Sequence, residues 1–138
     1  MNKISSIHIN GLKSYVSPTK IKLSDMNVFS GINSVGKSTC IQSILLLRLL
    51  YENLNERNSY LSESFLNSEK YGLELGTYEK IITGDNSFFE LGINNSKVKI
   101  AMKTGDSLKI QADLKNIISK TKINIFETEF FYLSAERN

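Results

Sequence analysis

The segment GINSVGKST at residues 31–39 constrains the fold of this chain more than any other feature. It matches the pattern of a glycine, four arbitrary residues, a glycine, a lysine and a serine or threonine, which is typical of phosphate-binding loops. The four fixed positions are Gly31, Gly36, Lys37 and Ser38. In such loops, backbone N–H groups point at the anion and the following helix directs the positive end of its dipole at the same charge. The pattern therefore predicts a strand, this loop and a helix, in that order.

The last two fixed positions carry side chains with specific chemistry. Lys37 can reach the β- and γ-phosphates of a nucleotide as a point charge. Ser38 can place its hydroxyl on Mg²⁺, whose other ligands would be phosphate oxygens and water. The alternative interpretation is an ordinary glycine turn between a strand and a helix.

The residues on either side of the loop fit this order. The apolar run that starts at Met26 predicts a buried strand over residues 26–30. Residues 40–50 are almost continuously apolar, as expected for a helix buried between a sheet and neighbouring elements. The most apolar part, ILLLRLL, is shorter than the roughly 20 residues that a membrane-spanning helix needs, and Arg48 interrupts it. We therefore expect no membrane partner.

Other strands are predicted by short apolar runs that alternate with polar residues or are rich in β-branched side chains. Two of them, at residues 4–9 and 21–23, should pair as a hairpin through the loop at 13–20. Three more should form an antiparallel meander with lysines on its solvent face, and they lie at residues 88–94, 97–103 and 107–112. The final strand is expected at residues 130–133. Between the long helix and the meander, residues 52–70 should be irregular or weakly helical, and 71–85 should be ordered.

Length and composition favour one cytoplasmic domain. A chain of 138 residues with 41% hydrophobic content can bury one core. The net charge is only +3, which does not favour a strongly basic nucleic-acid binder, so DNA is a partner that charge leaves unsupported. The single cysteine, Cys40, cannot form an internal disulfide, and the first ten residues lack the apolar core of a signal peptide.

Three polar or reactive residues outside the loop have competing interpretations. Cys40 lies in the first helical turn, where the helix dipole could lower the pKa of a thiol, and the alternative is a packed, inert cysteine. Gln42 could position a water molecule, although its place one turn into the helix favours a helix-surface side chain. His8 is the only histidine and has no partner acid or nucleophile at a recognisable spacing, so we expect it on a strand surface.

Four segments, taken in order, resemble the N-terminal half of bacterial AAA15/AAA21-type ATPases, which belong with the ABC, SMC, RecF and OLD-like ATPases. They are IHINGLKSY, NVFSGINSVGKSTCIQSILLL, YGLELGTYEKIITGDN and FFYLSAER. The resemblance implies an α/β fold, a P-loop NTPase lobe of ABC/SMC type with a β-meander and a sheet flanking the helix after the phosphate loop. Residues 1–138 would form a single N-terminal ATPase lobe.

The resemblance also assigns the site residue by residue. The site would bind the phosphates of ATP and a Mg²⁺ ion, with Ser38 as the metal ligand. Its residues would be Gly31, Asn33, Ser34, Gly36, Lys37, Ser38 and Thr39. Lys13 and Tyr15 would approach the base or the ribose, or else be a solvated lysine and a packed tyrosine. Glu136 and Arg137 would face the nucleotide or a second subunit, or else form a plain surface turn.

Two elements of the group have no counterpart in the sequence. Its members carry a Walker B acid and a signature loop in a later lobe, but no run of four apolar residues followed by Asp-Glu occurs here, and no serine- and glycine-rich signature segment. Hydrolysis needs a group that positions the attacking water, so the chain alone should bind ATP without hydrolysing it. We expect it to be one piece of a larger or split ATPase, completed by a second lobe or subunit in a head-to-head dimer.

The resemblance implies a role in anti-phage defence, where relatives act beside a nuclease partner, although the sequence shows no nuclease motif of its own. An alternative is a nucleotide-sensing module that does not hydrolyse ATP and regulates a partner protein. A small kinase is a weaker alternative because no acceptor-binding lid or catalytic acid is apparent.

Overall fold

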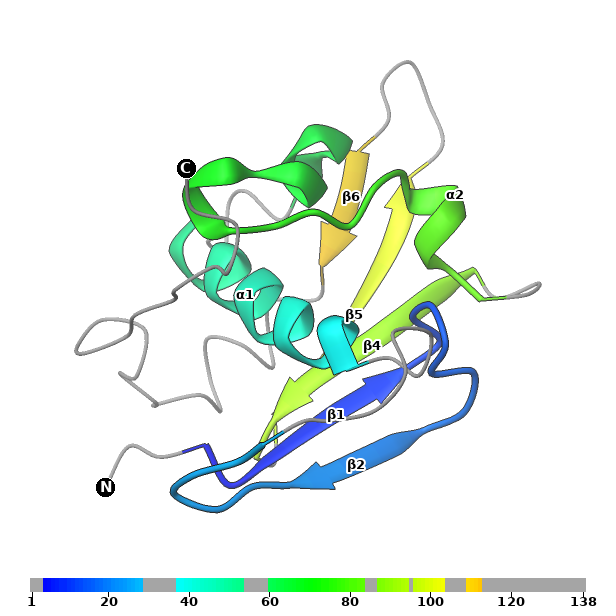
Figure 1. The fold of residues 1–138 in the computed structure, drawn as a ribbon. Helices are drawn as coiled ribbons and strands as arrows, with labels where there is room; N and C mark the ends of the chain where they lie inside the picture. Colours follow the sequence, from blue (N-terminus) through cyan, green and yellow to red (C-terminus); the bar gives the residue numbers. More distant parts are fainter. Residues whose placement is uncertain are drawn as a thin grey trace.

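The computed structural model describes residues 4–28, 37–53, 60–83, 87–94, 96–103 and 109–112. These residues form one six-stranded sheet in the order β2-β1-β4-β5-β6-β3, in which every neighbouring pair is antiparallel. The strands are β1 (Ser6–Asn10), β2 (Thr19–Lys22), β3 (Tyr60–Ser62), β4 (Phe88–Ile93), β5 (Ser96–Lys103) and β6 (Lys109–Ala112). Figure 1 shows β2, β1, β4, β5 and β6 side by side.

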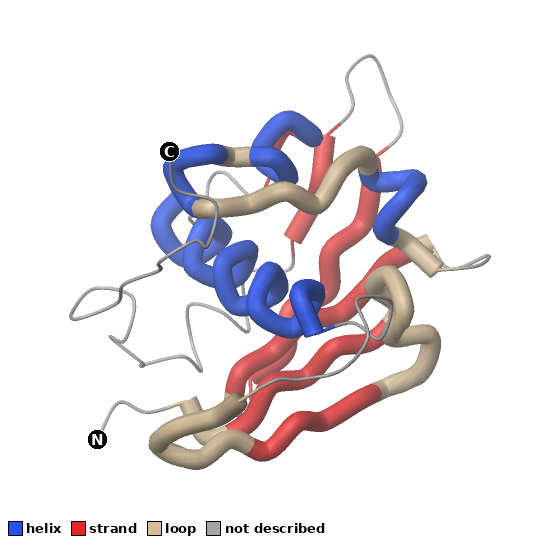
Figure 2. Tube along the Cα trace, viewed as in Figure 1, coloured by secondary structure: helices blue, strands red, loops and turns tan. Residues whose placement is uncertain are grey.

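Helical segments cover one face of this sheet. The long helix α1 (Lys37–Asn53) lies across β1 and β4, and the 3₁₀ turns η2 (Glu63–Asn67) and η3 (Glu69–Tyr71) lie on the same side (Figure 2). The short helix α2 (Tyr78–Ile81) precedes β4 and buries both of its terminal residues. The molecule therefore has a sheet layer and a helical layer, with the core between them.

Alternation along the strands builds that core. Ile7 and Ile9 of β1 are fully buried, and they pair with Ile93 and Leu91 of β4, so all four side chains lie on the face that α1 covers. The same face continues into β5 with Val98 and Ile100. Opposite them, α1 contributes a set of leucines that are at most 6% exposed: Leu45, Leu46, Leu47, Leu49 and Leu50. The interface between α1 and this sheet face is thus the centre of the core, which buried side chains from residues 61–81 extend.

The N-terminal hairpin and the meander are confirmed. β1 pairs with β2, and β4, β5 and β6 pair in succession, close to the predicted ranges. Lys97 and Lys99 are exposed, as the predicted solvent face requires. The long helix is also confirmed and extends beyond the predicted residues 40–50 at both ends. The strand predicted at 130–133 lies outside the described residues.

The predicted buried strand before the phosphate loop is wrong for the part that the structure describes, residues 26–28. Met26 is 84% and Val28 is 85% exposed. Between them, the Asn27 amide bonds both backbone groups of Ser24, accepting from its N–H at 2.8 Å and donating to its carbonyl oxygen at 2.9 Å. Such a local ring favours a turn over a strand, because it ties the side chain to the backbone three residues earlier. The described fold is therefore mixed α/β with an antiparallel sheet.

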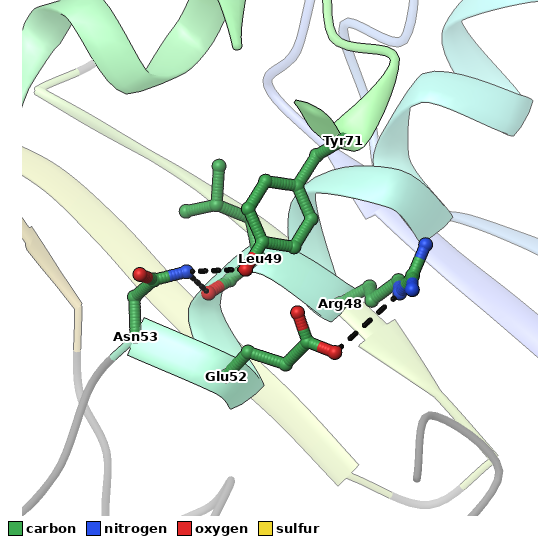
Figure 3. A network of polar contacts seen from close by, with 5 residues as sticks. All are labelled: Arg48, Leu49, Glu52, Asn53 and Tyr71. Carbon is green, nitrogen blue, oxygen red and sulfur yellow. Dashed lines mark hydrogen bonds and ion pairs between the residues drawn. The ribbon is translucent and has the colours of Figure 1, made fainter. Parts of the chain in front are cut away.

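The end of α1 is held against the segment that follows it (Figure 3). The Asn53 amide donates to the carbonyl oxygen of Leu49 at 2.8 Å and to the hydroxyl of Tyr71 at 3.0 Å. Arg48 pairs with Glu52 at 3.7 Å, and its guanidinium lies 5.7 Å from the centroid of the Tyr71 ring. The buried Tyr71 ring thus anchors the 3₁₀ turns to the last two turns of the helix.

Asn94, in the turn between β4 and β5, joins the start of the chain to the middle of the sheet. It has a positive φ of 55°, a conformation that asparagine tolerates better than most residues. Its side-chain oxygen accepts hydrogen bonds from the backbone N–H and the hydroxyl of Ser5, at 2.7 and 2.9 Å. Its backbone N–H donates to the carbonyl oxygen of Ser6 at 2.9 Å. One turn residue therefore fixes the start of β1 against the end of β4.

Phe89 offers a test of this core. It is fully buried, and its ring centroid lies 6.0 Å from that of Tyr78. Replacement by alanine should lower the free energy of unfolding by about 3–5 kcal/mol, because the lost apolar contacts leave a cavity. Urea unfolding followed by circular dichroism measures the change.

The matched control for the core test is Val16→Ala, at a position that is 65% exposed. It should change the free energy of unfolding by no more than about 0.5 kcal/mol. Similar urea midpoints for the two variants would contradict the described helix–sheet interface.

Candidate functional site

The start of α1 is the part of the predicted phosphate site that the structure describes. The helix begins at Lys37, so the lysine and the serine of the pattern occupy its first two positions. Its first turn contains no acidic residue. The first N–H groups of a helix have no partner within it and carry partial positive charge, so this end suits an anion. Predicted site residues outside the described residues are Gly31, Asn33, Ser34 and Gly36.

The two residues after Lys37 differ in exposure. Ser38 is exposed, which fits a hydroxyl that shares Mg²⁺ with phosphate oxygens and water. Thr39, in contrast, is buried, with only 6% of its surface exposed. Within the described residues, no group of three or more His, Cys, Asp or Glu side chains could hold a metal ion.

The loop that carries Lys13 is a tight turn fixed to the end of α2. Lys13 has a φ of +50°, and its backbone N–H donates to the carbonyl oxygen of Ile81 at 2.5 Å. The Lys13 carbonyl oxygen accepts a hydrogen bond from the Thr83 hydroxyl at 3.0 Å. Both backbone groups of Lys13 are thus engaged, one by the last residue of α2 and the other by Thr83, and its side chain is partly exposed.

The structure brings Tyr15 close to the first turn of α1. Its phenol interacts electrostatically with the Cys40 thiol, and burial followed by this interaction raises the pKa of Tyr15. The ring is partly buried and packs against the core. Tyr15 is therefore a packed tyrosine near the first turn of α1, and its contact with the base or the ribose stays a prediction.

Of the two interpretations of Cys40, the structure favours the packed, inert cysteine over a thiol with a lowered pKa. It is fully buried, and burial raises the pKa of its thiol from 9.0 to about 11. The loss of hydration disfavours the thiolate at this position, so the thiol is not activated.

Gln42 holds the helix to the segment after η3. Its amide nitrogen donates to the carbonyl oxygen of Gly72 at 3.0 Å, and its amide oxygen accepts from the backbone N–H of Glu74 at 2.9 Å. Both ends of the amide are engaged, so Gln42 is a structural bridge and does not position a water molecule. Sequence reasoning missed this role because the two partners are backbone groups about 30 residues away.

His8 lies on the sheet face opposite α1 and is partly buried. Its Nε2 atom is 3.1 Å from the carbonyl oxygen of Asn94, so Nε2 carries the donated proton. Burial, with the nearby Lys97 and Lys20, lowers the pKa of His8, although the hydrogen bond to Asn94 opposes this shift. The strand-surface prediction agrees with this position. Glu136 and Arg137 lie outside the described residues.

Comparison of the chain with protein-family models, with curated proteins and with solved structures gives no match. Among the described helices, none has the length and apolar character needed to cross a membrane.

The Cys40 thiol should react slowly in the folded chain. Because its pKa is about 11, it stays protonated at pH 8, where a disulfide reagent with a coloured product should label it only after unfolding in urea. Rapid labelling of the native chain at pH 8 would contradict its burial. Because the thiol ionises near pH 9 in the unfolded chain and near pH 11 in the folded chain, ionisation favours unfolding. The free energy of unfolding should therefore decline as pH rises from about 9 to 11, and this decline should be absent from Cys40→Ala.

Gln42→Ala should break the bridge between the helix and residues 72–74. We expect a loss of about 1–2 kcal/mol in the free energy of unfolding, since two hydrogen bonds disappear. Hydrogen exchange of the Glu74 amide, which donates to Gln42, should accelerate, whereas the Leu91 amide in β4 should keep its protection. The control is Ile41→Ala at the neighbouring exposed position, and equal Glu74 exchange in both variants would exclude the bridge.

Proposed function

We propose that this chain binds ATP with Mg²⁺ through residues 31–38, as the N-terminal lobe of an ABC/SMC-like ATPase. The observation that carries the proposal is the junction of the phosphate-loop pattern with α1. The pattern ends on the first two residues of a 17-residue helix whose first turn has no acid. A triphosphate placed there would meet free N–H groups and the positive end of the helix dipole.

The side chains of this proposed site have distinct roles. Lys37 offsets the charge of the β- and γ-phosphates, and the exposed hydroxyl of Ser38 contributes one ligand to Mg²⁺. When bound, Mg²⁺ neutralises phosphate charge and orients the phosphate chain. Tyr15, which interacts with Cys40 in the first turn of α1, borders this end of the helix. Lys13, two residues earlier, is the candidate for a contact with the base or the ribose.

Hydrolysis in this proposal requires residues from a second lobe or subunit. Phosphoryl transfer to water needs a group that positions the nucleophile, and the sequence offers no Walker B acid. ATP would then hold two such lobes together in a head-to-head dimer. Anti-phage defence beside a nuclease is the biological setting that the family resemblance suggests.

A second candidate function is a nucleotide sensor that regulates a partner without turnover. The Gln42 bridge favours it, because a displacement of α1 on ATP binding would pull on the backbone at Gly72 and Glu74. In this case ATP binding would change the hydrogen-exchange protection of the backbone amides at residues 72–74, and no phosphate would be released.

Lys37→Ala should weaken ATP binding at least about tenfold, since the removed charge serves the phosphates. Isothermal titration calorimetry of the chain with ATP and Mg²⁺ measures the change. Lys80→Ala, at an exposed position in α2, makes the same change of charge and should leave the affinity unchanged.

Phosphate release, followed on the same sample, tests whether this chain hydrolyses ATP on its own. Binding without release fits the ATPase lobe and the sensor, and sustained release would show that a catalytic acid lies within the 138 residues. Equal ATP affinity in wild type and Lys37→Ala would exclude the proposed site.

A further inference from the structure

The sheet face opposite α1 carries a row of side chains that the strand register places in line. Lys20 of β2 pairs with His8 of β1, His8 pairs with Gly92 of β4, and Gly92 pairs with Lys97 of β5. Residues directly opposite one another in antiparallel strands share a face. Two lysines therefore flank a histidine and a glycine, and the glycine adds no side chain to the middle of the row.

Positive charge gathers on this face from two strands. Exposed lysines lie on β2, as Lys20 and Lys22, and on β5, as Lys97 and Lys99. The two strands are three strand spacings apart, or roughly 14 Å. Within the described strands the single acidic residue is Glu90. The lysines thus border a channel whose charge is mostly positive.

His8 shows that the two sides of this channel act on the same point. Burial is the largest cause that lowers the pKa of the His8 imidazole, and Lys97 and Lys20, from opposite sides, lower it further. Beside it lies a hollow of about 90 Å³, lined by His8, Ile9, Asn10, Pro18, Thr19, Glu90 and Lys97. An anion seated here would relieve the repulsion between the lysines and a protonated His8.

An aromatic ring lies at the end of the same channel. Phe88 of β4 is partly exposed, and the Lys99 ammonium is 4.2 Å from its ring centroid. A base could stack on this ring if Lys99 moved to a phosphate. A positively charged channel with an aromatic platform is the usual arrangement of proteins that bind single-stranded nucleic acid.

We propose that the sheet face formed by β2, β1, β4 and β5 binds single-stranded nucleic acid, with Lys20, Lys22, Lys97 and Lys99 on its phosphates and Phe88 beneath a base. The charge of the face is complementary to a phosphate backbone. This function goes beyond the proposed ATP site, since it uses the face of the sheet that α1 does not cover.

Fluorescence anisotropy with a labelled 20-nucleotide oligothymidylate tests the proposal on the full chain. In 50 mM salt, Lys20→Ala with Lys97→Ala should weaken binding at least tenfold. It should also reduce the slope of log affinity against log salt by about 1.4, since two phosphate contacts disappear. The control is Lys70→Ala with Lys80→Ala, which removes two exposed lysines from outside the sheet and should leave affinity and slope close to wild type. Thermal unfolding verifies that both double variants are folded.

The NMR signals of His8 report independently on where the oligonucleotide binds. As the only histidine, it has a single set of imidazole NMR signals, which should shift on addition of the oligonucleotide. Phe88→Leu, which keeps an apolar side chain but removes the stacking platform, should weaken binding about fivefold or more. Lys37→Ala should bind the oligonucleotide like wild type, so failure of the ATP site would leave this result intact.

Several outcomes would overturn the proposal. They are no measurable binding of the oligonucleotide, an equal loss in the two lysine double variants, or binding that leaves the His8 signals unmoved. Binding of polyglutamate as tight as that of oligothymidylate, with no effect of Phe88→Leu, would mean that the face recognises acidic protein instead.

Discussion

The apolar contact between α1 and one face of the sheet is the interaction on which the rest of the structure depends. Ile7 and Ile9 of β1 meet the leucines of α1, and Leu91 and Ile93 continue the same surface in β4. This contact fixes the helix, so it also fixes where Lys37 and Ser38 lie relative to the sheet. Gln42 and Tyr71 add polar ties between the helix and the segment after it. A candidate site at the start of α1 therefore has a rigid support.

Much of this fold could be predicted from local patterns. Alternation identified β4 and β5, and the apolar run after the glycine-rich loop identified α1. The prediction of a buried strand is wrong at residues 26–28 because two apolar residues, Met26 and Val28, are exposed on either side of an Asn27 turn. Short apolar runs do not by themselves distinguish a strand from a turn. β3 was missed since its three residues are ordered by pairing with β6, a distant partner.

The candidate site, like the fold, has parts that the sequence predicted and parts that only the structure revealed. The phosphate-loop pattern is local, so the sequence was enough to place its lysine and serine at a helix start. The approach of Tyr15 to Cys40 and the Gln42 bridge came only from the tertiary structure. Net charge concealed the basic sheet face, because a total of +3 says nothing about which side of a strand each lysine occupies. Register, a property of strand pairing, reveals that face.

The Asn94 turn has a consequence for the order in which the chain can fold during synthesis. Its bonds to Ser5 join residues 89 apart in sequence, and β1 pairs on one side with β2 and on the other with β4. During synthesis on the ribosome, one edge of β1 stays unpaired by β4 until β4 and the Asn94 turn have emerged. The β4–β5 hairpin, made of neighbouring segments, can then close quickly and act as the template onto which the waiting strand docks.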